Sequence, residues 1–194
     1  PTYSSAAWLW CFYAIAAASF LPAIAFHYTG EEAIYTISSL EMWHRGEWVQ
    51  QLLYGSTLKR NPLFNWLAIP LASLAGWEHV LAVTRSITIA ATVATGVTLA
   101  WLVRALYRDA AFAAFAALVF LTIADVFFYR GWLAYTDPLF AFLVFGSIAC
   151  LWVACVRQSV PLLAAALVAL TAAFLAKTLT VYVFYGVAVA VLAL

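Results

Sequence analysis

Two adjacent acidic residues, Glu31 and Glu32, follow the first apolar stretch of the sequence. A carboxylate in such a place can act as a general base that takes the proton of an attacking hydroxyl group. The same segment also matches a capping box, with Thr29 as the N-cap residue and Glu32 as the third residue of a helix. Capping accounts for Glu32 in full and leaves two roles open for Glu31, a helix-start residue or a catalytic base.

Two adjacent cations, Lys59 and Arg60, precede a second helix-start signal, in which Asn61 is the N-cap residue and Pro62 the first helical residue. Because the helix dipole disfavours cations at this end, the pair is expected to have an anion nearby. The free amides of a helix N-terminus are themselves a phosphate site. Lys59 and Arg60 are therefore candidate phosphate ligands, and contact with solvent or lipid headgroups is the alternative.

Four further charged residues interrupt or border apolar stretches. Charges at membrane depth are costly and are usually functional or paired, which makes Lys177 a candidate site residue. Asp137 follows Thr136 and precedes a proline, so it is either a helix-start residue or part of a site. For Arg85 and Asp125 this line of reasoning favours ion pairing.

The composition is that of a membrane protein. Hydrophobic residues make up 68% of the 194 residues and charged residues 9%, against about 25% charged in soluble domains. The mean hydropathy is +1.01, and the net charge of +1 excludes the basic face of a nucleic-acid-binding protein. Cys11, Cys150 and Cys155 stand in apolar stretches without metal-type spacing, and the last two lie too far round one helix to form a disulfide.

Apolar stretches long enough to cross a bilayer, about 20 residues, recur along the chain. We expect a single transmembrane domain, residues 1–194, with six spans: 8–26, 80–103, 110–129, 137–156, 160–176 and 178–194. The chain begins without Met and stops inside an apolar run, so we expect it to be a fragment of a longer protein.

Residues 27–79 are expected to form an extramembrane loop with two helices that lie on the membrane surface. Apolar residues of the first helix recur at near-helical spacing, at Ile34, Ile37, Leu40 and Trp43. Gly46 is expected to end this helix. The second helix should run from Asn61 to about Gly76, interrupted by Pro70, and is too short to span, so it is expected to be interfacial or re-entrant.

Counting the spans alternately places loop 27–79, residues 130–137 and Lys177 on one side of the membrane. Three arginines fall on the other side: Arg104, Arg108 and Arg157. Lys and Arg are no fewer on the first side, so the positive-inside rule does not settle the orientation. The unusual charges nevertheless share one face.

The order of these motifs resembles that of the GT-C fold glycosyltransferases. The closest group is the protein O-mannosyltransferase and lipid A aminoarabinose transferase superfamily, which uses polyprenyl-phosphate sugars. Its Asp-Glu-x-x-Tyr motif is matched by residues 31–35, its Gly-x-Trp by 46–48, and its Lys-Pro-Pro-Leu-x-x-Trp-Leu by 60–67. An Arg early in the second span, a Thr-Asp pair and a Lys-Gly-Pro motif correspond to Arg85, Thr136-Asp137 and Lys177.

The resemblance covers nearly all of the chain, which corresponds to the N-terminal part of such enzymes. Three positions depart from the family pattern. The leading Asp is Glu31, the Lys of the proline motif is Arg60 with Lys59 beside it, and the Gly-Pro after Lys177 is missing.

The resemblance implies an all-α polytopic membrane domain of GT-C type that moves a sugar, with inversion, from a polyprenyl-phosphate donor to a lipid, glycan or protein acceptor. It implies catalytic roles for Glu31, as the base, and Glu32. It implies donor or phosphate binding by Lys59, Arg60, Lys177, Tyr35 and Arg85. Asp137 would support the site or help to hold a divalent cation.

The expected partners are the lipid-linked sugar donor and membrane lipid, with no nucleic acid. The expected location is the bacterial inner membrane, in the cell envelope, with the active face on the non-cytoplasmic side. Two other classes remain open. Intramembrane charges and broken helices also suit a transporter or flippase of a lipid-linked substrate, and a non-catalytic membrane scaffold is the third interpretation.

Overall fold

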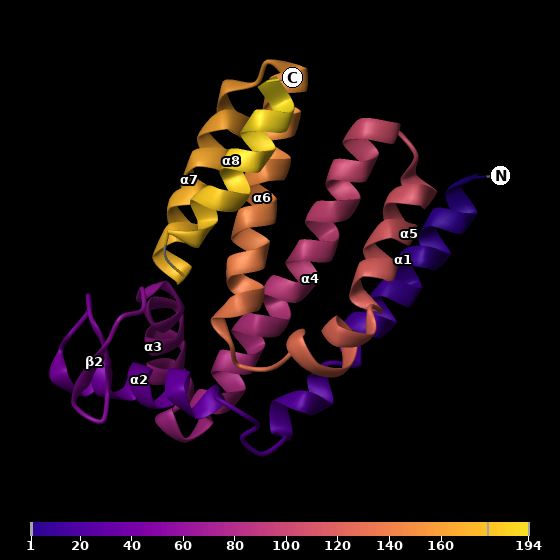
Figure 1. Ribbon diagram of the computed structural model, residues 1–194. Helices are drawn as coiled ribbons and strands as arrows, with labels where there is room; N and C mark the ends of the chain where they lie inside the picture. Colours follow the sequence, from indigo (N-terminus) through magenta and orange to yellow (C-terminus); the bar gives the residue numbers. More distant parts are fainter. Residues whose placement is uncertain (1, 178, 194) are drawn as a thin grey trace.

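The computed structural model describes residues 2–177 and 179–193, and most of them belong to helices (Figure 1). The α-helices are α1 (Thr2–Ala18), α2 (Glu32–Arg45), α3 (Leu63–Ala75), α4 (Val80–Tyr107), α5 (Ala110–Leu121), α6 (Thr136–Arg157), α7 (Val160–Lys177) and α8 (Thr180–Ala193). Short helical turns occur at η1 (Leu21–Ala25), η2 (Trp77–His79) and η3 (Val126–Arg130), and two strands at β1 (Gln51–Leu53) and β2 (Ser56–Leu58).

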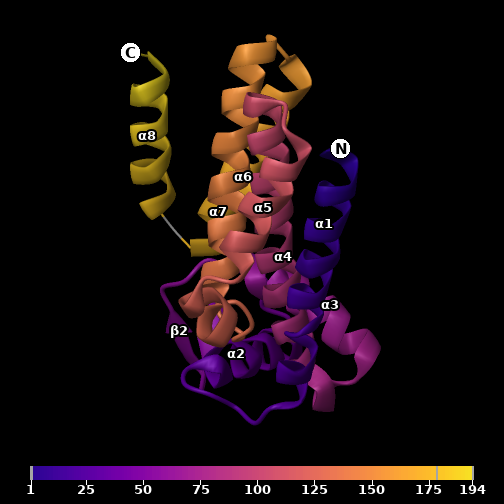
Figure 2. The ribbon, with the colours of Figure 1, turned by 90° about the vertical axis from the view of Figure 1, so that its right-hand side faces the viewer.

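The chain is an all-α integral membrane protein. Four helical segments are long and apolar enough to cross a membrane: Ser5–Ala25, Trp77–Tyr107, Thr136–Arg157 and Val160–Lys177. They run along one bundle axis, with α4 packed against α5 on one side and α6 on the other, while α1 packs on α5 and α7 on α6 (Figure 1). Viewed from the side, α8 stands apart from α6 and α7 (Figure 2), and its buried residue Val181 packs with side chains of those two helices.

These four segments coincide with four of the six expected spans. The other two expected spans, 110–129 and 178–194, contain shorter apolar helices, α5 with 12 residues and α8 with 14. After α5 the backbone passes through Thr122, whose hydroxyl donates to helix carbonyl groups, into the π-helical turn η3. Residues 178 and 194 lie outside the described residues.

Small side chains bring α1, α4 and α5 close together. Ala114 and Ala117 of α5 are fully buried, which allows close helix approach without a large side chain between the backbones. Tyr13 of α1 donates a hydrogen bond of 2.6 Å to the carbonyl oxygen of Val93 in α4. A Cβ atom at Gly96 would lie 2.5 Å from the Tyr13 hydroxyl, so this contact requires glycine at position 96.

Helices α2 and α3 and the strand pair lie together at one end of the bundle (Figures 1 and 2). As expected, α2 ends at Gly46, which has a φ of 64° and donates to the carbonyls of Met42 and Trp43. On its inner face, α2 presents polar side chains to α3: the Asn65 amide donates to the Ser39 hydroxyl at 2.9 Å.

Two expectations for α3 are wrong. Asn61 is not the N-cap residue, because its side-chain amide donates to the carbonyl of Phe174 in α7, and the helix begins at Leu63 after Pro62. Pro70 does not interrupt the helix. A proline removes one backbone donor, but the fully buried Phe64 and its neighbours on the same face keep α3 continuous to Ala75.

The sequence analysis did not predict the β-hairpin. Strands β1 and β2 pair antiparallel through a two-residue turn, Tyr54-Gly55, whose φ angles of 50° and 76° are both positive. Such a turn matches the twist of a hairpin. The Glu41 carboxylate of α2 accepts the amide hydrogens of Tyr54 at 2.7 Å and Gly55 at 3.1 Å, and so fixes the turn to α2.

Candidate functional site

A cavity of about 290 Å³ opens at the end of the bundle that carries α2 and the hairpin. Four segments that are far apart in the sequence line it: Glu31, Tyr35, Gln51, Lys59, Arg60, Asn61, Thr136, Asp137, Ala176 and Lys177. The lining includes six of the eight site residues expected from the sequence, and omits only Glu32 and Arg85. The fold therefore brings carboxylates, cations and a phenol together around one space.

The helical hairpin of α6 and α7 supplies one wall. Asp137 stands in the first turn of α6 and Lys177 at the end of α7, and because the two helices run antiparallel their side chains meet in an ion pair. Both side chains remain partly exposed, Asp137 at 40% and Lys177 at 48%. The Lys177 ammonium also lies 5.8 Å from the centre of the Phe140 ring. The amine is thus held at the rim and still open to a ligand.

The opposite wall is aromatic and cationic. The guanidinium of Arg60 lies over the Tyr35 ring, with 5.3 Å between its central carbon and the ring centre. The Tyr35 ring is fixed in turn by an edge contact with Phe64 at 5.5 Å and a tilted contact with Tyr135 at 6.1 Å. Lys59 is exposed beside Arg60. In the part of the chain that the structure describes, neither cation is ion-paired with a carboxylate.

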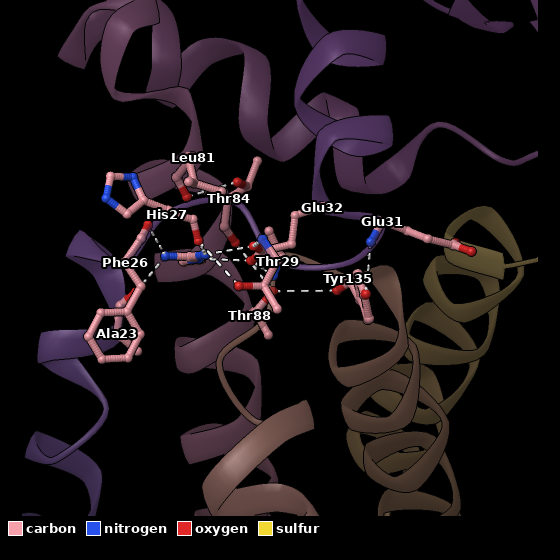
Figure 3. A network of polar contacts seen from close by, with 12 residues as sticks. Ala23, Phe26, His27, Thr29, Glu31, Glu32, Leu81, Thr84, Thr88 and Tyr135 are labelled. Atoms are coloured by element: carbon pink, nitrogen blue, oxygen red, sulfur yellow. Dashed lines mark hydrogen bonds and ion pairs between the residues drawn. The ribbon is translucent and has the colours of Figure 1, made fainter.

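Glu31 occupies the mouth of the cavity as an exposed residue directly before α2. Its backbone N–H donates to the Tyr135 hydroxyl at 3.0 Å, and its carboxylate extends away from the buried contacts of Glu32 (Figure 3). Among the described residues no cation pairs with this carboxylate. Gly30 has a φ of 60°, and a Cβ there would lie 2.4 Å from the Tyr135 hydroxyl oxygen.

Glu32 points the other way, into the protein, and its side chain has no exposed surface. Its two oxygens accept four hydrogen bonds: from Arg85 Nε at 2.8 Å, Arg85 Nη2 at 2.6 Å, Ala134 N at 2.8 Å and Thr29 N at 2.8 Å. The Thr29 contact is one half of the expected capping box. The expectation that capping explains Glu32 in full is nevertheless wrong, because the Arg85 pair takes most of its acceptor capacity.

Arg85 uses all five of its N–H groups inside the protein. Two bind Glu32, and the other three donate to backbone carbonyls of the turn η1 and the two residues after it: Ala23 at 2.6 Å, Phe26 at 2.6 Å and His27 at 2.8 Å. Its guanidinium also stacks over Trp132 at 5.4 Å. The expected ion-pair role of Arg85 is confirmed. The donor-binding role is not, since no N–H group remains for a phosphate.

The surroundings of Glu32 act on its pKa in opposite directions. Burial alone would raise the pKa, but the hydrogen bonds from Arg85, Ala134 and Thr29 and the Arg85 charge outweigh burial and lower it. Glu32 therefore remains a carboxylate with filled acceptor positions. A base needs a free lone pair, so the catalytic role expected for Glu32 does not fit the structure.

The side chains that the structure describes around Asp137 do not provide the ligands that a divalent cation would need there. Hard divalent cations need several oxygen ligands, whereas the Asp137 carboxylate is paired with Lys177. Across the described residues no group of three or more His, Cys, Asp or Glu side chains could hold a metal ion. The described donors around Asp137 therefore do not fit a divalent-cation site.

Gln51 is a polar lining residue that was not expected from the sequence. It comes from β1, is almost fully buried, and donates from Nε2 to the Asn61 carbonyl at 2.8 Å. Its Oε1 atom is buried and has no hydrogen-bond partner within the described chain. Only the unpredicted hairpin brings Gln51 there.

Asp125, expected to be ion-paired, lies 3.3 Å from Arg130 in the turn η3, which confirms that expectation outside the cavity. The three cysteines are free. In comparisons with known proteins, no family model, no curated protein and no solved structure matches this chain.

Proposed function

We propose that this chain carries the donor site of a membrane glycosyltransferase, which moves a sugar from a polyprenyl phosphate to an acceptor on a lipid, glycan or protein. One observation carries the proposal: a single cavity combines the free carboxylate of Glu31 with the cations Lys59, Arg60 and Lys177. A carboxylate base on one side and a phosphate-binding cluster on the other are what displacement of a phosphate from a sugar requires.

In the proposed reaction, the acceptor oxygen attacks the anomeric carbon of the sugar as the bond from that carbon to the phosphate oxygen breaks. The proton of the acceptor hydroxyl passes to the Glu31 carboxylate. The bonding electrons leave with the phosphate, so polyprenyl phosphate departs with one more negative charge. Attack from the face opposite to the leaving phosphate inverts the anomeric configuration.

The cations would hold the donor phosphate and stabilise the charge that it gains on departure. A guanidinium can bind two phosphate oxygens at once, which Arg60 could do while stacked on Tyr35. Lys59 adds a second charge from the hairpin side of the cavity. Lys177 would exchange part of its contact with Asp137 for the phosphate, and Asp137 would return as its partner after product release.

The size of the cavity favours the polar part of the donor. About 290 Å³ is at the small end of ligand sites, which start near 300 Å³, so the sugar phosphate would fill it. The isoprenoid chain would then lie in lipid beside the bundle. Gln51 also lines the wall, but its Oε1 atom is buried, so a sugar hydroxyl would reach it only after a shift of the side chain.

The proposed membrane position follows from the aromatic residues around α2 and α3. Trp43 packs against Trp48 at 6.3 Å and against Trp77 at 6.2 Å, which gathers three indoles next to the cavity end of the bundle. Tryptophan concentrates at the membrane–water interface. These indoles support a position of α2 and α3 in that interface. The non-cytoplasmic side and the bacterial inner membrane are part of the proposal and come from the resemblance alone.

The proposal is tested with Glu31→Gln, which keeps the shape of the side chain and removes its basicity. General-base catalysis contributes about 10²–10⁴-fold in rate. Transfer of a radiolabelled sugar from its lipid carrier should fall by that factor in the intact protein, with donor binding retained. Glu31→Asp should keep measurable transfer. Glu78→Gln is the matched control, because Glu78 is a 73% exposed acid outside the cavity.

Transfer at the parent rate by Glu31→Gln would contradict the proposal. Binding of the lipid-linked sugar without any transfer by the unmodified protein would instead favour a flippase or a scaffold. Movement of the lipid across vesicles that hold the purified protein separates these two classes.

A further inference from the structure

The other end of the bundle holds a second polar pocket. Its volume is about 510 Å³, and it is lined by Trp101, Arg104, Ala105, Arg108 and Arg157. Arg104 and Arg108 come from the end of α4 and Arg157 from the end of α6, both at the end remote from α2 and α3 (Figure 1). Two helices distant in the sequence thus direct three guanidinium groups to one space.

The charges of this pocket are not balanced by the protein. Its lining contains no carboxylate, and in the described chain none of its three arginines forms an ion pair. The acid next in sequence, Asp109, caps α5 by accepting the amide hydrogens of Ala111 and Phe112. The helix dipole stabilises a cation near a helix C-terminus. It does not account for three arginines that share one pocket.

An apolar track leads from the pocket toward the middle of the membrane. Val97, Trp101, Arg104 and Arg108 are spaced by four, three and four residues, which puts them on one face of α4. Val97 is 46% exposed. The arginines therefore stand at the end of a span, and Trp101 and then Val97 follow toward the middle of the membrane. A phospholipid presents its headgroup, its interfacial part and its acyl chain in the same order.

We infer that this pocket binds the phosphate headgroup of an anionic phospholipid, with an acyl chain along the Val97 and Trp101 face of α4. Arginine pairs with phosphate through two parallel hydrogen bonds, and basic pockets between membrane helices are suited to anionic headgroups. A free phosphate ion would use the same cations but would gain nothing from the apolar track. The site lies at the opposite end of the bundle from the sugar-transfer cavity and is independent of it.

The test is lipid binding by the purified intact protein, measured by native mass spectrometry with phosphatidylglycerol and phosphatidylcholine as probes. Phosphatidylglycerol should bind in preference. Replacing Arg104, Arg108 or Arg157 singly by Gln should weaken its binding about fivefold each, and replacing all three about 100-fold. Arg45→Gln is the matched control, an exposed arginine at the other end of the bundle that should leave binding unchanged.

Two further arms separate the remaining explanations. The triple Lys variant keeps the charge that supports membrane topology but loses the two-point contact, so it should bind more weakly than the parent and more tightly than the triple Gln variant. Inorganic phosphate should fail to displace phosphatidylglycerol. Equal binding of both lipids, displacement by inorganic phosphate, or parent-like binding by the triple Gln variant would each overturn the inference.

Discussion

Glu32 and Arg85, 53 positions apart in the sequence, face each other through two hydrogen bonds of 2.8 and 2.6 Å, and neither side chain is exposed. The pair joins the start of α2 to α4, and through Ala134 it also holds the turn before α6. Glu31, the next residue back, stands at the cavity mouth. One of two adjacent acids therefore fixes the position of the other.

Removal of the Glu32 charge should destabilise the fold strongly. In Glu32→Gln, Arg85 would remain buried without a counter-charge, and breaking a buried pair in this way typically costs about 3–5 kcal/mol. Thermal unfolding in detergent should show a markedly lower midpoint. The exposed control, Glu78→Gln, should change the free energy of unfolding by less than about 0.5 kcal/mol. Equal midpoints for both variants would show that the pair does not support the fold.

Acid should weaken the same contact. The folded-state pKa of Glu32 lies below its ordinary value of 4.5, so the folded state binds this proton less readily than the unfolded state. Its contribution to stability is therefore complete above pH 4.5 and is lost as the pH falls through the lower folded-state pKa. Unfolding midpoints measured at descending pH should drop in that range. A smaller drop is expected in Glu32→Gln, which lacks the titrating group.

Replacing both Lys59 and Arg60 by Gln should weaken binding of a polyprenyl phosphate. Hydrogen bonds to charged groups contribute about 1.5–3 kcal/mol each, so the affinity should fall about tenfold or more. Folding should be unaffected, because both side chains are exposed. Arg45→Gln, an exposed arginine outside the cavity, should bind like the parent. Unchanged affinity in the double variant would show that Lys59 and Arg60 do not bind the donor phosphate and only contact lipid headgroups.

Labelling of single cysteines should place the two ends of the bundle on opposite sides of the membrane. Ser56 lies in the hairpin at the cavity end, and Gln158 lies in the turn between α6 and α7. In a background without Cys11, Cys150 and Cys155, an impermeant thiol reagent should reach Ser56→Cys and Gln158→Cys from different sides. Reaction of both from the same side would contradict the proposed topology.

Gly30→Ala should disturb the cavity mouth. The new Cβ would lie 2.4 Å from the Tyr135 hydroxyl, and the φ of 60° is unfavourable for alanine, with strain of about 1–3 kcal/mol. Both stability and sugar transfer should fall. Gly146→Ala is a suitable control, because a Cβ at Gly146 meets nothing within 4 Å. Parent-like transfer by Gly30→Ala would show that the contact of Glu31 with Tyr135 does not position the base.

The sequence was informative where local chemistry decides the structure. Alternate counting of apolar spans brought Asp137 and Lys177 to one face, and the structure pairs them. Gly46 ends α2 because a positive φ is needed there. These features depend on hydropathy and on backbone conformation, both of which a single sequence displays.

Contacts between distant segments were harder to infer. The capping motif offered a sufficient local explanation for Glu32, so the link to Arg85 could not be deduced from either residue alone. The hairpin was missed because each strand has three residues, too few for an alternating pattern. Gln51 was missed for the same reason, because its position in the cavity depends on the hairpin turn that Glu41 fixes to α2.

The scattered origin of the cavity lining has a consequence for biosynthesis. Ribosomes release a chain from its N-terminus, and membrane segments can associate as they emerge. Glu32 can meet Arg85 once α4 has inserted, whereas the contact of Glu31 with Tyr135 must wait until the segment after α5 has been made. The wall that holds Lys177 is made only after α6 and α7 have both entered the bilayer and turned back. During its own synthesis the protein thus makes Glu31 before the last cation of the cavity, and the proposed sugar transfer would have to wait until α7 is in place.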